Sequence, residues 1–284
     1  MRLTFILVAL CFILSCRSAP YTGRKQLSLI PASQLDAMGV QAFNAMLQQQ
    51  PTTEDPDIVK YIQCVTDPLV KVVSAEHDDA PKEWRLAVMK DLTPNAFALP
   101  GGNIGVHVGL LKAAKTDEQL ATVIGHELGH VLANHSGERV SQNVIAQGGL
   151  ALTQGFLLSD MSPQKRGLLM AALGVGAQVG VLLPFSRTQE SESDIIGLNL
   201  MARAGFDPRQ SVDLWRNMMA ETQGGQPPEF MSTHPAPEAR IEKLQESIPA
   251  VLSVYENAKK EQGRTPASEC KRPTEKLNAI FQTK

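Results

Sequence analysis

Residues 116–135, TDEQLATVIGHELGHVLANH, constrain the fold of this chain more than any other segment. Thr116 and Gln119 are spaced as a helix-capping box, Asp117 and Glu118 fill the first turn, and apolar residues recur at helical spacing. The segment is therefore predicted to be a helix with a well-defined start.

An H-E-x-x-H element, His126-Glu127-Leu128-Gly129-His130, lies at the centre of this helix. Residues four apart share a helix face, so His126 and His130 can present ring nitrogens to one metal ion. Glu127, next to the first histidine, then points toward a bound water. This arrangement indicates one zinc ion per chain. Because a chain with 6 histidines can contain the motif by chance, the prediction requires a third ligand.

A second helical pattern, in residues 186–205, carries the acidic candidates for that ligand. Glu190 and Asp194 are four apart and share a face. A carboxylate from this helix would complete a His₂Glu set with one position left for water, and Asp194 is placed to hydrogen-bond a ligating histidine. Spacing alone does not choose between Glu190 and Glu192 as the ligand. Acidic residues on a helix ordinarily lie on its solvated face, and we expect Glu192 to lie there.

A small sheet is predicted immediately before the metal helix. Residues 84–89 alternate like a strand, and residues 95–100 and 103–108 form a hairpin signal through Gly101 and Gly102. The edge of such a sheet can hold an extended peptide by strand addition. His107 in this hairpin is expected to pack or to support the site without binding the metal.

The first segment predicts a targeting signal. One basic residue precedes an apolar run over residues 3–14, which is too short for a permanent membrane span. Residues 13–16, Ile-Leu-Ser-Cys, resemble the bacterial lipobox, in which the cysteine is diacylated. The absence of Asp after Cys16 resembles lipoproteins of the outer membrane. We therefore expect a periplasmic protein held by a lipid anchor, and the alternative is a plain signal peptide with an incidental cysteine.

Two cysteines remain if Cys11 is removed with the signal and Cys16 is lipidated. In an oxidising compartment, Cys64 and Cys270 are expected to form one disulfide, worth about 5 kcal/mol on the chain-entropy account. The alternative is two free buried thiols.

Charge and hydropathy exclude two further classes of protein. With 27 basic and 29 acidic residues and no basic stripe, nucleic acid is not an expected partner. Two apolar stretches, residues 144–158 and 167–185, are interrupted by glycine, glutamine or proline, so neither is predicted to span a membrane. They are expected to be a buried helical pair, or a mobile pair that covers the cleft or rests on a membrane surface.

Several motifs together resemble one family. HELGH, the preceding NAFALPGG, the E-x-x-x-D of Glu190 and Asp194 followed by AGFDP, and the later STHPAPEARI are similar to the HtpX/BepA/LoiP group of zinc metallopeptidases, relatives of the CAAX prenyl proteases. The match covers residues 84–244. In its overall form, the chain is most similar to LoiP-like periplasmic lipoprotein peptidases. It implies that Glu190 is the third ligand and that His234 and Arg240 reach the site.

The predicted architecture is a mostly helical α+β fold, a zincin-like (gluzincin) metallopeptidase with a small antiparallel sheet. We expect a signal peptide and lipobox in residues 1–16, a tether and entry helix in 17–53, the catalytic domain in 54–250, and a C-terminal helix and tail in 251–284.

The predicted function is zinc-dependent cleavage of unfolded or misassembled cell-envelope proteins, with the outer-membrane assembly machinery as a possible partner. Glu127 would act as general base, and His234 and Arg240 would stabilise the oxyanion. A further hypothesis is that His234 swings onto the metal and makes a latent enzyme. The alternative function is a zinc-stabilised scaffold or chaperone of outer-membrane protein assembly with little proteolysis, although such a protein has no need of Glu127.

Overall fold

A computed structural model describes residues 16–146, 172–173, 185–221, 229–235, 237–262 and 269–282. The elements of these residues, in chain order, are β1 (Cys16–Ser18), β2 (Lys25–Leu27), α2 (Ala32–Gln49), α3 (Pro56–Glu76), β3 (Arg85–Met89), β4 (Ala96–Leu99), β5 (Asn103–His107), α4 (Leu110–Ala113), α5 (Asp117–Leu132), α6 (His135–Ala146), α8 (Arg187–Arg203), α9 (Gln210–Ala220), α10 (Glu229–Thr233), α11 (Pro237–Gln262) and α12 (Thr274–Gln282).

The described part of the chain is mostly helical, with a small three-stranded sheet and an antiparallel hairpin of β1 and β2, which confirms the predicted α+β class. The strand order is β3-β5-β4, and β5 is antiparallel to β4 but parallel to β3. The sheet is therefore mixed, whereas an antiparallel one was expected. The reason lies in the path of the chain. After β3 the chain crosses to the far edge of the sheet and forms β4. The hairpin at Gly101 and Gly102 then reverses it, so that β5 lies between β3 and β4.

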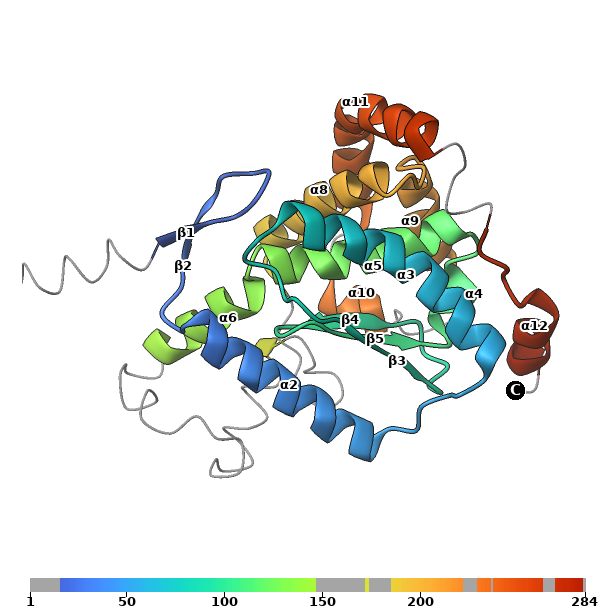
Figure 1. The fold of residues 1–284 in the computed structure, drawn as a ribbon, viewed down its shortest axis with the longest axis horizontal. Coiled ribbons are helices and arrows are strands. Elements are labelled where there is room, and N and C mark those ends of the chain that lie inside the picture. Colours follow the sequence, from blue (N-terminus) through green and yellow to red (C-terminus); the bar gives the residue numbers. More distant parts are fainter. Residues whose placement is uncertain are drawn as a thin grey trace, which may run out of the picture.

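Helices cover both faces of this sheet (Figure 1). Val88, Ile104 and Val106 point into the main core with α3 and α5. Phe97 and Leu99 point the other way and pack against α2. The alternation of side chains along a strand produces this division, so both faces of a narrow sheet are used for packing.

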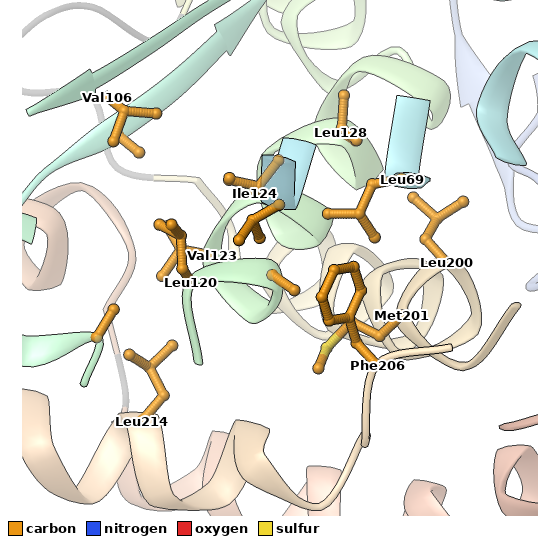
Figure 2. Packing of buried hydrophobic residues seen from close by; sticks show 14 of the residues in the cluster. Leu69, Val106, Leu120, Val123, Ile124, Leu128, Leu200, Met201, Phe206 and Leu214 are labelled. Atoms are coloured by element: carbon orange, nitrogen blue, oxygen red, sulfur yellow. The ribbon is translucent and has the colours of Figure 1, made fainter. Parts of the chain in front are cut away.

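Helix α5 runs through the core. Figure 2 shows its side chains Leu120, Val123, Ile124 and Leu128 among apolar side chains of neighbouring elements. All four are completely buried. Burial of each such side chain is worth about 1.5–3 kcal/mol, so the element that carries H-E-x-x-H is held rigidly by packing.

Helix α8 crosses α5 at close range, which glycine makes possible (Figure 1). A Cβ atom on Gly129 would lie 2.8 Å from the carbonyl oxygen and from the hydroxyl of Ser193. A Cβ atom on Gly125 would lie 3.2 Å from the carbonyl oxygen of Gly197. The hydroxyl of Ser193 donates a hydrogen bond to the carbonyl oxygen of His126 at 2.8 Å. This close approach brings the acids of α8 to the histidines of α5.

The predicted helix starts are found with one difference of detail. The side chain of Thr116 accepts a hydrogen bond from the backbone N–H of Gln119, but Gln119 Oε1 accepts from the backbone of Lys115. Ser186 and Gln189 form the complete capping box at the start of α8.

Cys64 of α3 and Cys270, which precedes α12, are joined by a disulfide with an S–S distance of 2.06 Å. The bond ties the last described helix to α3, 206 residues away along the chain.

Residues 1–15 of the predicted signal segment lie outside the described residues, as do the two Gly-rich stretches apart from residues 144–146, 172–173 and 185. None of the helices in the described part of the chain combines the length and the apolar character needed to cross a bilayer. The predicted domain limits stay a prediction. β1, β2 and α2 occupy the expected tether and entry region, and α11 continues past residue 250.

Candidate metal centre

Four side chains from three helical segments converge at one buried point. His126 and His130 come from α5, Glu190 from the first turn of α8, and His234 directly follows α10. One ligand atom of each lies within 4.8 Å of the others. Each of these residues is at most 3% exposed. The acid in this group is Glu190, the residue that the family resemblance implied.

The separations of these atoms fit a tetrahedral zinc ion. His126 Nε2 lies 3.0 Å from His130 Nε2, 3.4 Å from Glu190 Oε2 and 3.2 Å from His234 Nδ1. Ligand atoms about 2.0–2.1 Å from a tetrahedral zinc lie about 3.3 Å from one another. Glu127 Oε1 is also buried and accepts no hydrogen bond from the described residues, with His234 Nε2 3.5 Å away. The residues present therefore fit one zinc ion with a carboxylate beside it.

The electrostatics of the donors favour a cation. Burial holds the pKa of His130 well below its ordinary value, so this ring is neutral and has a lone pair to offer. Burial alone would raise the pKa of Glu190, but the charges of His234 and Arg240 hold it well below its usual range. Burial would lower the pKa of His126, but its acidic neighbours raise it to about 9. Metal binding at His126 would therefore release a proton.

Asp194 and Arg240 support the ligands from behind. Asp194 Oδ1 lies 2.9 Å from His126 Nδ1, the predicted contact, and this directs Nε2 of that histidine toward the metal point. Arg240 Nε donates to Asp194 Oδ2 at 2.8 Å, and its Nη1 lies 2.7 Å from Glu190 Oε2. Its guanidinium also stacks 3.9 Å from the Trp215 ring centre. These contacts indicate that Arg240 neutralises and positions the carboxylates of Asp194 and Glu190. The oxyanion contact of Arg240 stays a prediction.

The expectation that Glu192 lies on a solvated face was wrong. Glu192 is 3% exposed and accepts hydrogen bonds from Thr22, Arg24 and His135. The β1–β2 hairpin supplies Thr22 and Arg24, which helical spacing in α8 does not reveal. Burial alone would raise the pKa of Glu192, but these donors lower it to about 2. His135 Nδ1 in turn lies 2.8 Å from His130 Nδ1, a contact with a ligand that sequence reasoning missed.

Two aromatic rings at the site were also missed. Phe185 stacks on His130 with ring centres 3.8 Å apart, and Phe230 stacks on His234 at 4.4 Å. Phe185 ends an apolar stretch and Phe230 lies in the polar segment before His234, and spacing marks neither for a special role. They limit how the two histidine rings can turn.

Two further predicted residues lie away from the cluster. His107 is fully buried in β5, with Nδ1 3.3 Å from the hydroxyl of Thr93, in keeping with a packing role. Cys16 is the first residue of β1, and its predicted lipidation remains untested.

Comparison with known proteins places this geometry among metallopeptidases. The chain is 41% identical to the mitochondrial metalloendopeptidase OMA1 of Schizosaccharomyces pombe over 168 residues, covering 59% of this chain and 47% of the relative. It is 32% identical to OMA1 of Saccharomyces cerevisiae over 210 residues, covering 66% and 56%. It is 27% identical to the β-barrel assembly-enhancing protease of Escherichia coli over 238 residues, covering 82% and 48%. The chain thus spans about half the length of the curated relatives it matches.

These relatives contradict the predicted location. A lipid-anchored protein of the periplasm and outer membrane was expected, but three relatives that are 32–41% identical are mitochondrial metalloendopeptidases, and the Escherichia coli assembly protease, at 27% identity, is more distant. The physical reason is that an apolar run behind one basic residue suits entry into more than one membrane. Receptors read such signals, so apolar composition alone does not determine the compartment.

Residues 58–248 match the family described as Peptidase family M48. That range contains H-E-x-x-H, Glu190, Asp194, His234 and Arg240, together with the sheet that precedes α5. Sequence match, fold and donor geometry agree over the same residues. The chain therefore belongs to peptidase family M48.

Proposed function

We propose that this protein is a zinc-dependent endopeptidase in which His126, His130 and Glu190 hold the metal and Glu127 is the general base. The observation that carries the proposal is a buried cluster of four metal donors beside a buried carboxylate oxygen, Glu127 Oε1, on the helix that carries two of those donors. The curated relatives named above as metalloendopeptidases and proteases support the same reaction class.

Glu127 is suited to moving a proton. When bound, zinc would supply a Lewis acid for the scissile carbonyl and lower the pKa of a water to about 7. Burial raises the pKa of Glu127, which brings this carboxylate closer to the range of an effective base near neutral pH. Its Oε1 can accept the proton of the attacking water and deliver it to the leaving amine.

The edge of the sheet offers a place for the substrate. Among the described residues, β4 is an outer strand paired only with β5. The backbone N–H of Ala98 in this strand donates to the carboxylate of Glu127, so the unpaired edge faces the proposed base. An extended peptide added to this edge would pass the metal point and would be held through backbone hydrogen bonds.

Such binding requires an unfolded segment, which supports unfolded or misassembled proteins as the substrate class. Cell-envelope proteins as substrates and an outer-membrane assembly machinery as partner are the finer form of this proposal. The similarity to the β-barrel assembly-enhancing proteases of Yersinia pestis and Escherichia coli supports both. LoiP-like specificity stays a prediction.

His234 is placed for either of two roles. Its Nδ1 lies 3.0 Å from Glu190 Oε1, and its Nε2 lies 3.5 Å from Glu127 Oε1. As a fourth ligand it would take the position that water needs, giving a latent enzyme. After moving away, it could donate to the oxyanion. A closed set of four protein ligands is also typical of structural zinc, and this observation favours the alternative of a zinc-stabilised scaffold or chaperone.

Cleavage of reduced casein by the zinc-loaded protein separates these functions. The parent should cleave, and Glu127→Gln should retain one zinc per chain but lose about 10²–10⁴-fold in rate. Removal of zinc by a chelator should abolish cleavage, and added zinc should restore it. Equal rates for the parent and Glu127→Gln would contradict the proposed base.

His234→Ala tests the role of the fourth donor in the same assay. A faster variant would establish latency, and a slower one with zinc still bound would establish the oxyanion role. Absence of cleavage by the parent and by His234→Ala, with one zinc in each, would establish the scaffold.

A further inference from the structure

A continuous series of contacts, buried except at Arg24, links the N-terminal hairpin to one of the metal ligands. Arg24 Nε donates to Glu192 Oε2 at 2.9 Å, and His135 Nε2 lies 2.9 Å from the same oxygen. On its other side, His135 Nδ1 lies 2.8 Å from His130 Nδ1. His135 is completely buried, so the described contacts shield both ring nitrogens from solvent.

The chemistry of these groups determines where the ring protons lie. The Glu192 carboxylate accepts from Thr22 and Arg24, so it acts as an acceptor toward His135 as well, and His135 Nε2 must carry a proton. A neutral imidazole has one N–H, which makes His135 Nδ1 an acceptor. His130 Nδ1 must therefore donate to it. The lone pair of His130 is then on Nε2.

His130 Nε2 is also the nitrogen that lies among the other candidate zinc ligands. His130 Nε2 lies 3.0 Å from His126 Nε2 and 3.5 Å from Glu190 Oε1. A histidine binds metal through an unprotonated nitrogen, so this tautomer is the one required.

We propose that Glu192 and His135 are positioning residues that act in series to direct His130 Nε2 toward zinc, and that Arg24 orders this pair from the hairpin. The proposal rests on the zinc-dependent function proposed above. His126 obtains the same orientation directly, from Asp194. The N-terminal hairpin is then part of the machinery that holds the metal.

The backbone between the two helices is shaped for this contact. Helix α5 ends at Leu132, and Asn134 has a φ of 53°, in the left-handed region that asparagine tolerates better than most residues. This turn starts α6 at His135 and returns the ring to His130. Five residues along an uninterrupted helix would have placed the ring on another face.

The protonation pattern can be observed directly in the zinc-loaded parent by ¹⁵N NMR of the histidine rings. We expect protons on His135 Nε2 and on His130 Nδ1, with His135 Nδ1 unprotonated. A proton on His135 Nδ1 would overturn the proposal, because His130 could then not donate to it.

Zinc dissociation constants, measured by competition with a chromophoric chelator, test the energetic consequence. We expect Glu192→Gln and His135→Leu to bind zinc about 10–100-fold more weakly than the parent. His135→Gln should lose less zinc affinity than His135→Leu, because the amide of glutamine can both accept from His130 and donate to Glu192. Arg24→Gln should lose less zinc affinity than Glu192→Gln or His135→Leu.

Glu138→Gln is the matched control. Glu138 is also a buried acid bound by Arg24, at 2.9 and 2.8 Å, but in the described part of the chain it forms no hydrogen bond or ion pair with His135 or His130, and only its charge acts on His135. Its zinc affinity should be close to that of the parent. Unfolding of the metal-free forms in urea separates positioning from simple packing, because unchanged zinc affinity with lower stability in Glu192→Gln would overturn the proposal.

The two proposals can fail separately. Loss of zinc affinity in Glu192→Gln, together with no casein cleavage by the parent or by His234→Ala, would refute the peptidase and leave the positioning series intact. Cleavage by the parent with parent-like zinc affinity in Glu192→Gln and His135→Leu would refute the series alone.

Discussion

At the scale of single residues, the metal centre depends on a balance of buried charges. Arg240 is 4% exposed and lies between Asp194 and Glu190. Without this cation, two buried carboxylates would lack a counter-charge in the metal-free protein. Because removal of one partner from a buried ion pair costs about 3–5 kcal/mol, Arg240→Leu should lower the free energy of unfolding by about that amount in a urea titration.

Arg216→Leu is the control for this prediction. Arg216 pairs with Asp213 on the surface, where its side chain is 58% exposed, so the loss should be below about 1 kcal/mol. Equal losses of unfolding free energy in the two variants would show that the buried charges at the metal centre stabilise the protein no more than a surface ion pair does.

Glu192 should also give the metal-free protein a distinct dependence of stability on pH. Its contacts with His135, Arg24 and Thr22 lower its pKa from the ordinary 4.5 to about 2 in the folded state. Between these values the unfolded chain binds more protons, so stability rises with pH. The contribution is therefore complete above about pH 4.5 and is lost as the pH falls toward 2. Urea titrations over this window should show a shallower slope for Glu192→Gln, and an unchanged slope would contradict the assignment.

At the scale of elements, the distance between α5 and α8 decides whether the donors meet. A Cβ atom on Gly129 would lie 2.8 Å from backbone and hydroxyl oxygens of Ser193, closer than such atoms pack, whereas one on Gly125 would lie 3.2 Å from its nearest neighbour. Gly129→Ala should therefore push the helices apart and weaken zinc binding more than Gly125→Ala. Chelator competition on both variants measures this, and the reverse order would show that the crossing distance does not control the site.

At the scale of the whole molecule, the disulfide closes a very long loop. Cys64 and Cys270 are 206 residues apart, for which the chain-entropy account gives about 5 kcal/mol of stabilisation. The double variant Cys64→Ser/Cys270→Ser should lose stability of this order in urea. Because the bond joins α3 to the residues before α12, and neither segment contributes a donor to the metal cluster, zinc affinity should be unchanged. A large loss of zinc affinity would mean that the bond also shapes the site.

Sequence alone determined the local parts of this protein. Helical periodicity and capping residues predicted α5 and α8, because helix hydrogen bonds and caps join residues only a few positions apart. The spacing of His126 and His130 put both on one face for the same reason. The hairpin at Gly101 and Gly102 is likewise a local turn.

The tertiary structure decided which side chains meet across the fold. Glu190 and Glu192 are two positions apart, or about 200° around a helix, so one faces the histidines and the other the hairpin once α8 is docked. Arg24 and Glu192 are 168 residues apart, and His135 and Glu192 are 57 apart, distances at which no sequence period operates. Packing of separate elements brings these groups together. Spacing could therefore propose a third ligand, and the family resemblance could imply Glu190, but docking of the helices and the hairpin supplied the physical distinction between that ligand and the acid that contacts His135.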